Sequence, residues 1–169
     1  MDHAVYRAVA GTPSPRLDAA LARLSNAANQ SRLWLAIAAG LVVLGSARER
    51  RAATVGVVAI GVTSVVTNVV VKQVFGRNRP ERTIRDTIAH VRMPATASFP
   101  SGHSASAFAF ASAVGGELPR LALPLRALAA GVAYSRVHTG VHYPSDVVVG
   151  SLLGATAGML VRHIARTRR

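Results

Sequence analysis

Two histidines and one aspartate in this chain have a spacing that suits nucleophilic and acid–base chemistry. His142 and Asp146 are four residues apart in HYPSD, and His103 ends the stretch PSGH. A carboxylate on one imidazole nitrogen fixes the tautomer and leaves the other nitrogen free to attack. A second histidine can then protonate the leaving oxygen as a general acid. We therefore predict His142 as the nucleophile, Asp146 as the residue that orients it, and His103 as the acid.

Basic residues near these histidines would hold an anion. Lys72 and Arg136 stand at the ends of apolar segments, Arg79 follows Lys72 in the polar loop, and Arg77 and Arg82 lie nearby in the chain. Arginine presents a planar fork of donors that suits phosphate oxygens, and lysine adds a point charge. The start of a predicted helix at PSGH adds backbone N–H groups and the positive end of a dipole. With so many donors, the site fits phosphate better than carboxylate.

Apolar segments separate these residues and would have to bring them together. Half of the residues are hydrophobic and only 16% are charged, which favours a membrane protein over a soluble domain. A lone strand cannot satisfy its backbone in hydrocarbon, so we predict an all-α bundle of membrane helices. A span needs about 20 apolar residues, including those that flank its core. Five candidate spans are present: 33–47, 52–71, 103–118, 121–134 and 147–161.

The N-terminal arm, residues 1–31, has no signal-peptide pattern. Leu17, Leu21 and Leu24 recur in it at helical spacing. This pattern predicts an amphipathic helix that lies in the membrane interface, with a soluble arm as the alternative. Trp34 begins the first apolar segment, where an interfacial aromatic residue is expected.

The alternating direction of the spans predicts that the polar residues meet on one side of the membrane. The active-site loop at 72–102, the end of the fourth span and the start of the fifth all fall on this side. A lone histidine, arginine or proline at a helix end has an ordinary structural explanation, but ionisable groups gathered at one face indicate a functional site. We therefore expect a single membrane domain over 1–169 with its site at one end of the helices.

Composition argues against several other kinds of site. The net charge is +13, and Lys72 is the only lysine among 20 basic residues. Few aromatic residues and much apolar sequence make nucleic acid the least expected partner. Cysteine is absent, and the seven carboxylates are scattered without the spacing of a two-metal clamp. We therefore expect no metal and no cofactor, and the basic charge leaves anionic membrane lipids or a phosphorylated substrate as the expected partners.

Three stretches together resemble the signature of the type 2 phosphatidic acid phosphatase superfamily, which includes lipid phosphatases, bacterial acid phosphatases and vanadium haloperoxidases. KQVFGRNRP has the form K-x6-R-P, PSGH follows it, and SRVHTGVHYPSD has the form S-R-x5-H-x3-D. The resemblance implies a metal-independent helical bundle in which His142 forms a phosphohistidine, Asp146 orients it and His103 is the general acid. It also implies that the phosphoryl oxygens are bound by Lys72, Arg79, Ser101, the Gly102 amide and Arg136.

Two more residues of the third stretch, Ser135 and His138, are candidates to support the site or to contact substrate. A neutral role is the alternative for His138. Larger membrane members of the superfamily have six spans, whereas five and an N-terminal helix are expected here. This departure concerns the N-terminal topology and not the site.

More weakly, the chain resembles small actinobacterial members of the superfamily in its short length, its alanine and arginine bias and the wording of its motifs. One of these is assigned to the dephosphorylation of decaprenylphosphoryl-5-phosphoribose in arabinan precursor synthesis. We therefore predict hydrolysis of a lipid-linked phosphate monoester, with a polyprenyl-linked substrate first. Undecaprenyl diphosphate, phosphatidylglycerol phosphate and phosphatidic acid are alternative substrates. A vanadate-dependent haloperoxidase and a non-catalytic binder of anionic lipid are the alternative functions.

Charge also predicts an orientation in the plasma membrane. RERR at 48–51 and the basic C-terminus at 162–169 are expected on the cytoplasmic side, which puts the site on the extracytoplasmic face. The arm and the active-site loop are also arginine-rich, so the opposite orientation stays open. Gly150, Gly154 and Gly158 recur every four residues and predict close helix packing, within the chain or, as the alternative, in a homo-oligomer.

Overall fold

We describe the protein from a computed structural model for residues 2–11, 14–80, 91 and 93–168, without the side chains of Val70 and Lys72. These residues form helices and connecting segments with no strand, which confirms the predicted all-α class. The α-helices are α1 (Asp2–Ala10), α2 (Pro15–Ala27), α3 (Arg32–Leu44), α4 (Ala47–Val65), α5 (Lys72–Val74), α6 (Gly102–Glu117), α7 (Pro119–His138) and α8 (Pro144–Thr167). A 3-10 turn, η1 (Asn29–Ser31), precedes α3, and a π-helical turn, η2 (Val66–Val71), follows α4.

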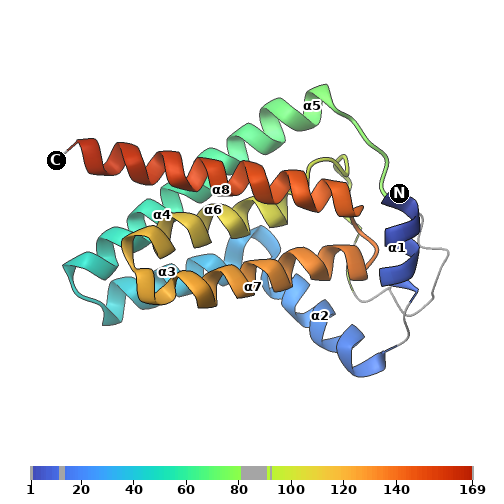
Figure 1. Ribbon diagram of the computed structural model, residues 1–169, viewed down its shortest axis with the longest axis horizontal. Coiled ribbons are helices and arrows are strands. Elements are labelled where there is room, and N and C mark those ends of the chain that lie inside the picture. The colour runs from blue at the N-terminus through green and yellow to red at the C-terminus, as the bar shows by residue number, and fades with distance from the viewer. Residues whose placement is uncertain (1, 12–13, 81–90, 92, 169) are drawn as a thin grey trace.

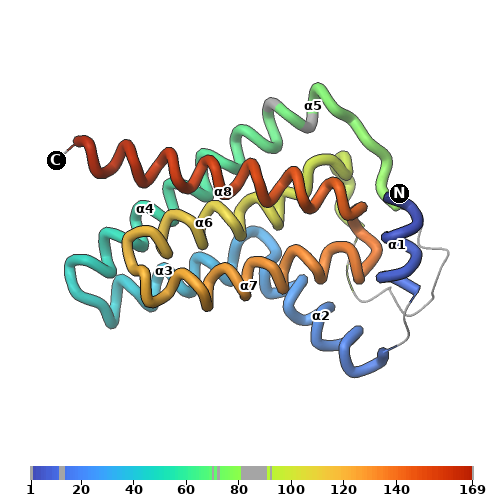
Figure 2. Tube along the Cα trace, in the orientation of Figure 1, coloured from blue at the N-terminus to red at the C-terminus, as the bar shows by residue number. Residues whose placement is uncertain are grey.

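The long helices run side by side along the long axis of the molecule, with α6 in contact with α4, α7 and α8. Figures 1 and 2 show α1 and α2 at one end of this bundle and the C-terminus at the other. We call the first the loop end, because α6 and α8 begin there and α7 ends there. We call the other the arginine end, because Arg48 and Arg166 meet there at Glu117, with contacts of 2.8 Å each.

Small residues let α6 take this central place. Most of its side chains are alanine, serine or glycine, so the neighbouring helices approach closely, and Phe110 fills the remaining space. The Phe110 ring lies 5.6 Å from that of Trp34 on α3. Trp34 is fully buried, so the expectation of an interfacial tryptophan was wrong. Packing against the Phe110 ring inside the bundle removes this indole from the surface.

Three glycines of α8 face the backbone of α6, and we call this contact the glycine seam. A Cβ atom on Gly154 would come within 2.0 Å of the Ala105 carbonyl oxygen, and one on Gly150 or Gly158 would meet α6 in the same way. The seam therefore depends on residues without side chains. Of the two predicted uses of these glycines, the seam corresponds to close helix packing within the chain. A homo-oligomer stays a prediction and would have to use another face.

The five expected apolar segments correspond to α3, to α4 with η2, and to α6, α7 and α8. By length and composition, two of the described helices can cross a membrane, at Ala47–Val69 and Pro144–Thr167. A third span exists only if the pair Pro15–Ala27 and Asn29–Leu44, bent by 61°, crosses as one unit. The predicted count of five spans is therefore not confirmed.

The N-terminal arm contains the expected amphipathic helix, α2, and a further short helix, α1. Leu21 is buried and Leu24 packs against the main core, whereas Leu17 is 41% exposed. The apolar face of α2 contacts α7, so this helix closes one side of the loop end. Tyr6 of α1 packs on Tyr143 between α7 and α8.

Candidate active site

His142 lies buried at the loop end with its Nε2 atom beside a guanidinium group. Nη1 of Arg79 is 3.3 Å from Nε2, and His142 is only 2% exposed. A guanidinium group can only donate hydrogen bonds, so Nε2 is the acceptor and carries a lone pair. The hydrogen of the neutral ring is then on Nδ1. This is the tautomer that a nucleophilic Nε2 requires.

Asp146 lies on the Nδ1 side of this ring. Its Oδ2 atom is 3.5 Å from Nδ1, which is longer than a normal hydrogen bond and lacks its geometry. Such contacts often tighten when substrate binds. The carboxylate is fully buried and is held by the hydroxyl of Ser98 and by the backbone N–H of Tyr143, 2.9 Å away. Its position is thus fixed independently of the histidine.

Burial lowers the pKa of His142 to about 4. The carboxylate of Asp146 opposes this shift, and the charges of Arg79 and Arg136 add to it. The ring is therefore neutral at physiological pH. Its Nε2 lone pair can attack without a separate base to remove a proton.

Arg77 links Asp146 to the N-terminal helix α1. Its Nη1 is 3.1 Å from Oδ1 of Asp146, and its Nη2 is 2.8 Å from Oδ2 of Asp2. Asp2 also accepts hydrogen bonds from the backbone N–H and the hydroxyl of Ser145, at 3.0 and 2.6 Å. Burial raises the pKa of Asp2, but the hydrogen bonds from Ser145 and Arg77 outweigh it and leave the pKa below its ordinary value. Asp2 is therefore ionised at neutral pH and holds Arg77 against Asp146.

His103, the second residue of α6, is half-buried. Its Nε2 atom is 2.9 Å from Oδ1 of Asn29, which belongs to η1 between α2 and α3. The backbone N–H of Ser101 donates to the carbonyl oxygen of Asp146 at 2.9 Å. This bond ties the start of α6 to the start of α8, so His103 and Asp146 have a fixed spacing.

Arg79 has the clearest position of the predicted phosphate-binding residues. Its guanidinium donates to the carbonyl oxygens of Thr96, at 2.9 Å, and of Val141, at 2.7 Å. These bonds hold the positive charge beside His142. An anion bound there would therefore meet a preformed donor.

The other predicted phosphate ligands are placed differently. Arg136 is fully buried, and its guanidinium donates to the Ser25 hydroxyl of α2. Its backbone carbonyl oxygen accepts a hydrogen bond from the backbone N–H of His142 at 3.1 Å. The Ser101 hydroxyl is buried as the N-cap of α6 and accepts from Ser104. Gly102 lines the cavity at a helix start, where backbone N–H groups lack helical partners. The Lys72 side chain and Arg82 lie outside the described residues.

Ser135 and His138 are both buried and both contact other parts of the protein. The Ser135 hydroxyl donates to the carbonyl of Val132 within α7, at 2.6 Å. Nε2 of His138 lies 2.6 Å from Oδ1 of Asp18 on α2. His138 therefore connects α7 to the N-terminal arm, and α2 in turn holds Arg136.

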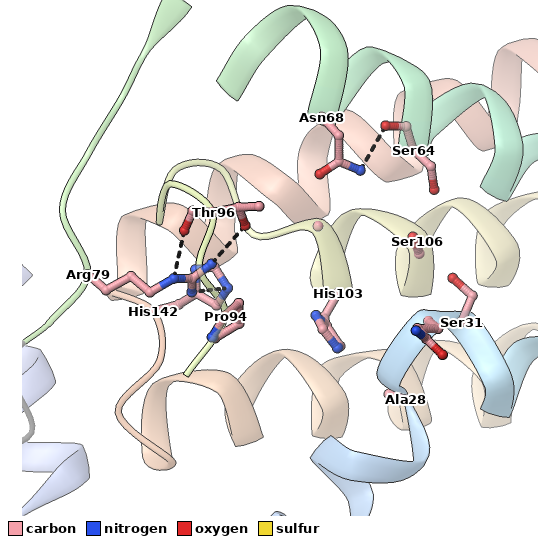
Figure 3. Close-up of a pocket in the computed structure, with 12 residues that line it drawn as sticks. Ala28, Ser31, Ser64, Asn68, Arg79, Pro94, Thr96, His103, Ser106 and His142 are labelled. Carbon is pink, nitrogen blue, oxygen red and sulfur yellow. Dashed lines mark hydrogen bonds between the residues drawn. The ribbon is translucent and has the colours of Figure 1, made fainter. Parts of the chain in front are cut away.

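A cavity of about 200 Å³ opens between the two histidines. Figure 3 shows Arg79 and Thr96 beside His142 on one side, Ser31 and Ser106 on the same side as His103, and Asn68 with Ser64 on the helix above them. The π-helical turn η2 carries Asn68 into this wall, as π-turns often do at functional sites. The lining residues are Ala28, Gln30, Ser31, Ser64, Asn68, Arg79, Pro94, Thr96, Gly102, His103, Ser106 and His142.

Sequence reasoning missed several contacts of this site. Ser98 stands three residues before Ser101 in ASFPSGH, so its nearness to a motif was an available signal. Asn29 and Asp2 contact partners 74 and 143 residues away in the chain. No local pattern marks such partners, because their roles depend on the folded arrangement alone.

Residues 52–169 match the PAP2 superfamily. The chain is 37% identical over 151 residues to decaprenylphosphoryl-5-phosphoribose phosphatase of Mycolicibacterium smegmatis, a match to 87% of this chain and 77% of that protein. It is 40% identical over 101 residues to the protein of the same name from Mycobacterium tuberculosis. That match covers 60% of this chain, which spans only 55% of the relative's length.

A solved structure shows the same arrangement. The crystal structure of the first transmembrane PAP2-type phosphatidylglycerolphosphate phosphatase from Bacillus subtilis superposes with a TM-score of 0.78 at 25% identity. The superposition covers 99% of this chain and 86% of that one. With residues 52–169 matched, which is more than half of its length, the chain belongs to the PAP2 superfamily.

Proposed function

We propose that this protein is a metal-independent membrane phosphatase that hydrolyses a lipid-linked phosphate monoester through a phosphohistidine. The observation that carries this proposal is the position of Nε2 of buried His142, 3.3 Å from Nη1 of Arg79 and beside a cavity. Membership of the superfamily and the phosphatase names of its relatives support a phosphoric monoester hydrolase.

The first half-reaction joins phosphorus to His142. Nε2 attacks the phosphorus atom, the bond to the leaving oxygen breaks, and His103 gives that oxygen its proton. Asp146 stabilises the positive charge that the ring acquires, and Arg79 with the amide of Gly102 binds the phosphoryl oxygens. The product of this step is a free alcohol.

The second half-reaction restores the enzyme. Water attacks the phosphorus atom and gives a proton to His103, which is now the base. The bond between phosphorus and Nε2 breaks, and inorganic phosphate leaves with His142 neutral again. Both steps use the same two histidines in opposite order, as microscopic reversibility requires.

A polyprenyl-linked substrate such as decaprenylphosphoryl-5-phosphoribose is our first candidate, and cell-wall precursor synthesis its setting. The identity of 37–40% to phosphatases named for that compound supports it. Undecaprenyl diphosphate, phosphatidylglycerol phosphate and phosphatidic acid are the alternatives. Phosphate release from these four lipids by the purified protein in detergent would rank them, and no release from any of them would contradict the proposal.

Trapping the covalent intermediate tests the mechanism. Labelled substrate quenched in base should leave phosphate on the wild-type protein, in an acid-labile bond, and none on His142→Ala. We expect turnover by His142→Ala to fall at least about a hundredfold. His163→Ala, in the exposed last turns of α8, is the matched control. An intermediate that persists in His142→Ala would assign the nucleophile to another residue.

We place the site on the extracytoplasmic face of the plasma membrane. The basic segments at 48–51 and 162–168 gather at the arginine end, away from the cavity, where Arg48 and Arg166 meet Glu117. Basic residues are enriched on the cytoplasmic side of membrane proteins. A reporter that works only in the cytoplasm should be active when it is fused after Arg169. An inactive fusion would invert this orientation.

A further inference from the structure

The leaving alcohol of any phosphomonoester bound here must lie beside His103. In phosphoryl transfer the attacking and leaving atoms stand roughly in line on opposite sides of phosphorus. With His142 as the attacking group, the alcohol points away from it and towards the residue that protonates it. The chemistry of this part of the cavity therefore decides which alcohols fit.

An elbow between α2 and α3 forms the far wall beside His103. It consists of the η1 turn, in which Gln30 and Ser31 adopt left-handed backbone conformations with φ of 52° and 60°. Both residues line the cavity. Ser64 and Asn68 line it from α4 and η2, and Ser106 lines it from α6. Five uncharged polar residues thus line the cavity from the elbow and from the wall opposite it, although the helices around them are largely apolar.

The elbow also orients His103. Nδ2 of Asn29 donates to Oδ1 of Asn26 at 3.3 Å, which turns Oδ1 of Asn29 towards the imidazole. An amide oxygen can only accept, so Nε2 of His103 carries a hydrogen. The proton that reaches the leaving oxygen is then the one on Nδ1 of the imidazolium. Asn29 is therefore a positioning residue for the acid.

Neighbouring bonds decide what the wall can offer a ligand. Oε1 of Gln30 accepts from Arg32 at 3.0 Å, so the amide of Gln30 offers its NH₂ donors. Nδ2 of Asn68 donates to the Ser64 carbonyl at 2.9 Å, so Asn68 offers its Oδ1 acceptor. Donor and acceptor face the same space, together with hydroxyl groups. Such a set pairs well with alcohol hydroxyls, which both donate and accept.

We propose that this elbow and the polar wall opposite it form a subsite for a hydroxyl-bearing leaving group of the sugar class. The proposal rests on the phosphatase function above and deepens it. At about 200 Å³ the cavity is smaller than the roughly 300–1,000 Å³ of sites for drug-sized ligands, so it takes a head group and leaves a lipid chain outside. An apolar alcohol is disfavoured because it would leave the polar groups of the wall without hydrogen-bond partners.

The elbow is separate from the machinery common to the family. The superfamily match begins at residue 52 and excludes the whole elbow, whereas both histidines lie inside it. The elbow residues Gln30 and Ser31 therefore lie outside the match, whereas the wall residues Ser64, Asn68 and Ser106 lie inside it with the two histidines. A change in the elbow should alter which phosphate ester binds and leave the phosphoryl-binding groups in place.

Two soluble phosphate esters test the subsite without requiring turnover. Ribose 5-phosphate and butyl phosphate share the phosphoryl group and differ in the alcohol. Their affinities can be obtained from the ligand-dependent rise of the thermal unfolding midpoint of the full chain in detergent. We expect ribose 5-phosphate to bind about tenfold more tightly. We expect Asn68→Leu and Gln30→Gly, which keeps the left-handed backbone, each to reduce this preference to less than about threefold.

Thr54→Val is the matched control, because Thr54 is exposed near the arginine end of α4. It should keep the wild-type preference. Equal affinities in the wild type, or a preference that survives in both elbow and wall variants, would overturn the subsite. A clear ribose 5-phosphate preference without phosphate release from any lipid would contradict the proposed function alone. Release from a lipid-linked sugar phosphate with equal affinities for the two esters would contradict the subsite alone.

Discussion

His142 and His103 line one cavity, but the chain holds them by different means. His142 is almost fully buried, with Arg79 at Nε2, Asp146 at Nδ1 and the Arg136 carbonyl at its backbone. His103 is half-buried and is oriented by Asn29 from a distant turn. In the proposed reaction the His142 side binds the phosphoryl group, which is the same in every substrate. The His103 side contacts the alcohol, which differs between substrates, and Asn29, which supports His103, lies outside the family motifs.

The strongest way to break this comparison is Asp146→Asn. The amide can present its NH₂ group to Nδ1 and so favour the wrong tautomer, as in the analogous serine-protease triad. We expect turnover to fall by about 10³-fold or more with every substrate, whatever its leaving group. Release of p-nitrophenol and of lipid-bound phosphate would be measured in parallel. A loss confined to one of the two would place Asp146 on the acid side instead.

Replacing the acid should have a selective effect. We expect His103→Gln to lose about 10²-fold or more in turnover of alkyl phosphates, because their leaving oxygen needs a proton. p-Nitrophenyl phosphate should lose much less, because nitrophenolate leaves without protonation. Rates for a series of aryl phosphates would show this as a steeper dependence on leaving-group pKa. An equal loss across the series would argue against His103 as the acid.

Asn29→Leu should reproduce this selectivity at smaller size. Loss of one hydrogen bond to the acid is expected to cost about tenfold in turnover of alkyl phosphates. Asn26→Leu, which removes the acceptor of the Asn29 amide, should cost less. A merely structural role for Asn29 would lower all rates together. The same aryl phosphate series separates the two cases.

Asp2→Asn should have the smallest effect of these changes, and the effect should be on stability. The substitution removes the charge that holds Arg77 against Asp146 on the His142 side of the cavity. We expect a loss of about 1 kcal/mol in the free energy of unfolding, as for a lost helix N-cap. Because folding lowers the pKa of Asp2, its contribution is present above about pH 5. It disappears as the pH falls below the ordinary value of 3.8. Unfolding midpoints of both proteins should therefore converge in acid, and a constant difference at all pH values would exclude the charge as the cause.

The sequence predicted the helices well because apolar runs and helix caps are local signals. The third apolar segment, expected at 103–118, is observed as Gly102–Glu117, where the Ser101 side chain caps the start. The two histidines, Arg79 and Gly102 were found because short motifs contain them, and they do line one cavity. Their catalytic roles remain proposals.

Contacts across the chain could not be predicted in this way. Trp34 was expected at the membrane interface, because an aromatic residue at the start of an apolar run is typical of that position. In the structure it packs against Phe110 in the core instead. The Asp2–Arg77 pair joins residues whose neighbours show no shared pattern. Such partners follow from the packing of α1 on α7 and α8, which only the folded chain defines.

The glycine seam has a consequence for how the protein responds to its lipid surroundings. Gly150 meets the backbone of Ser101, so α6 and α8 touch main chain to main chain just where His103 and Asp146 begin their helices. A contact without side chains has no rotamers to rearrange when bilayer thickness or lateral pressure changes. We therefore expect the helices to tilt as one unit, with the spacing of His103 and Asp146 unaffected by the acyl chains around them.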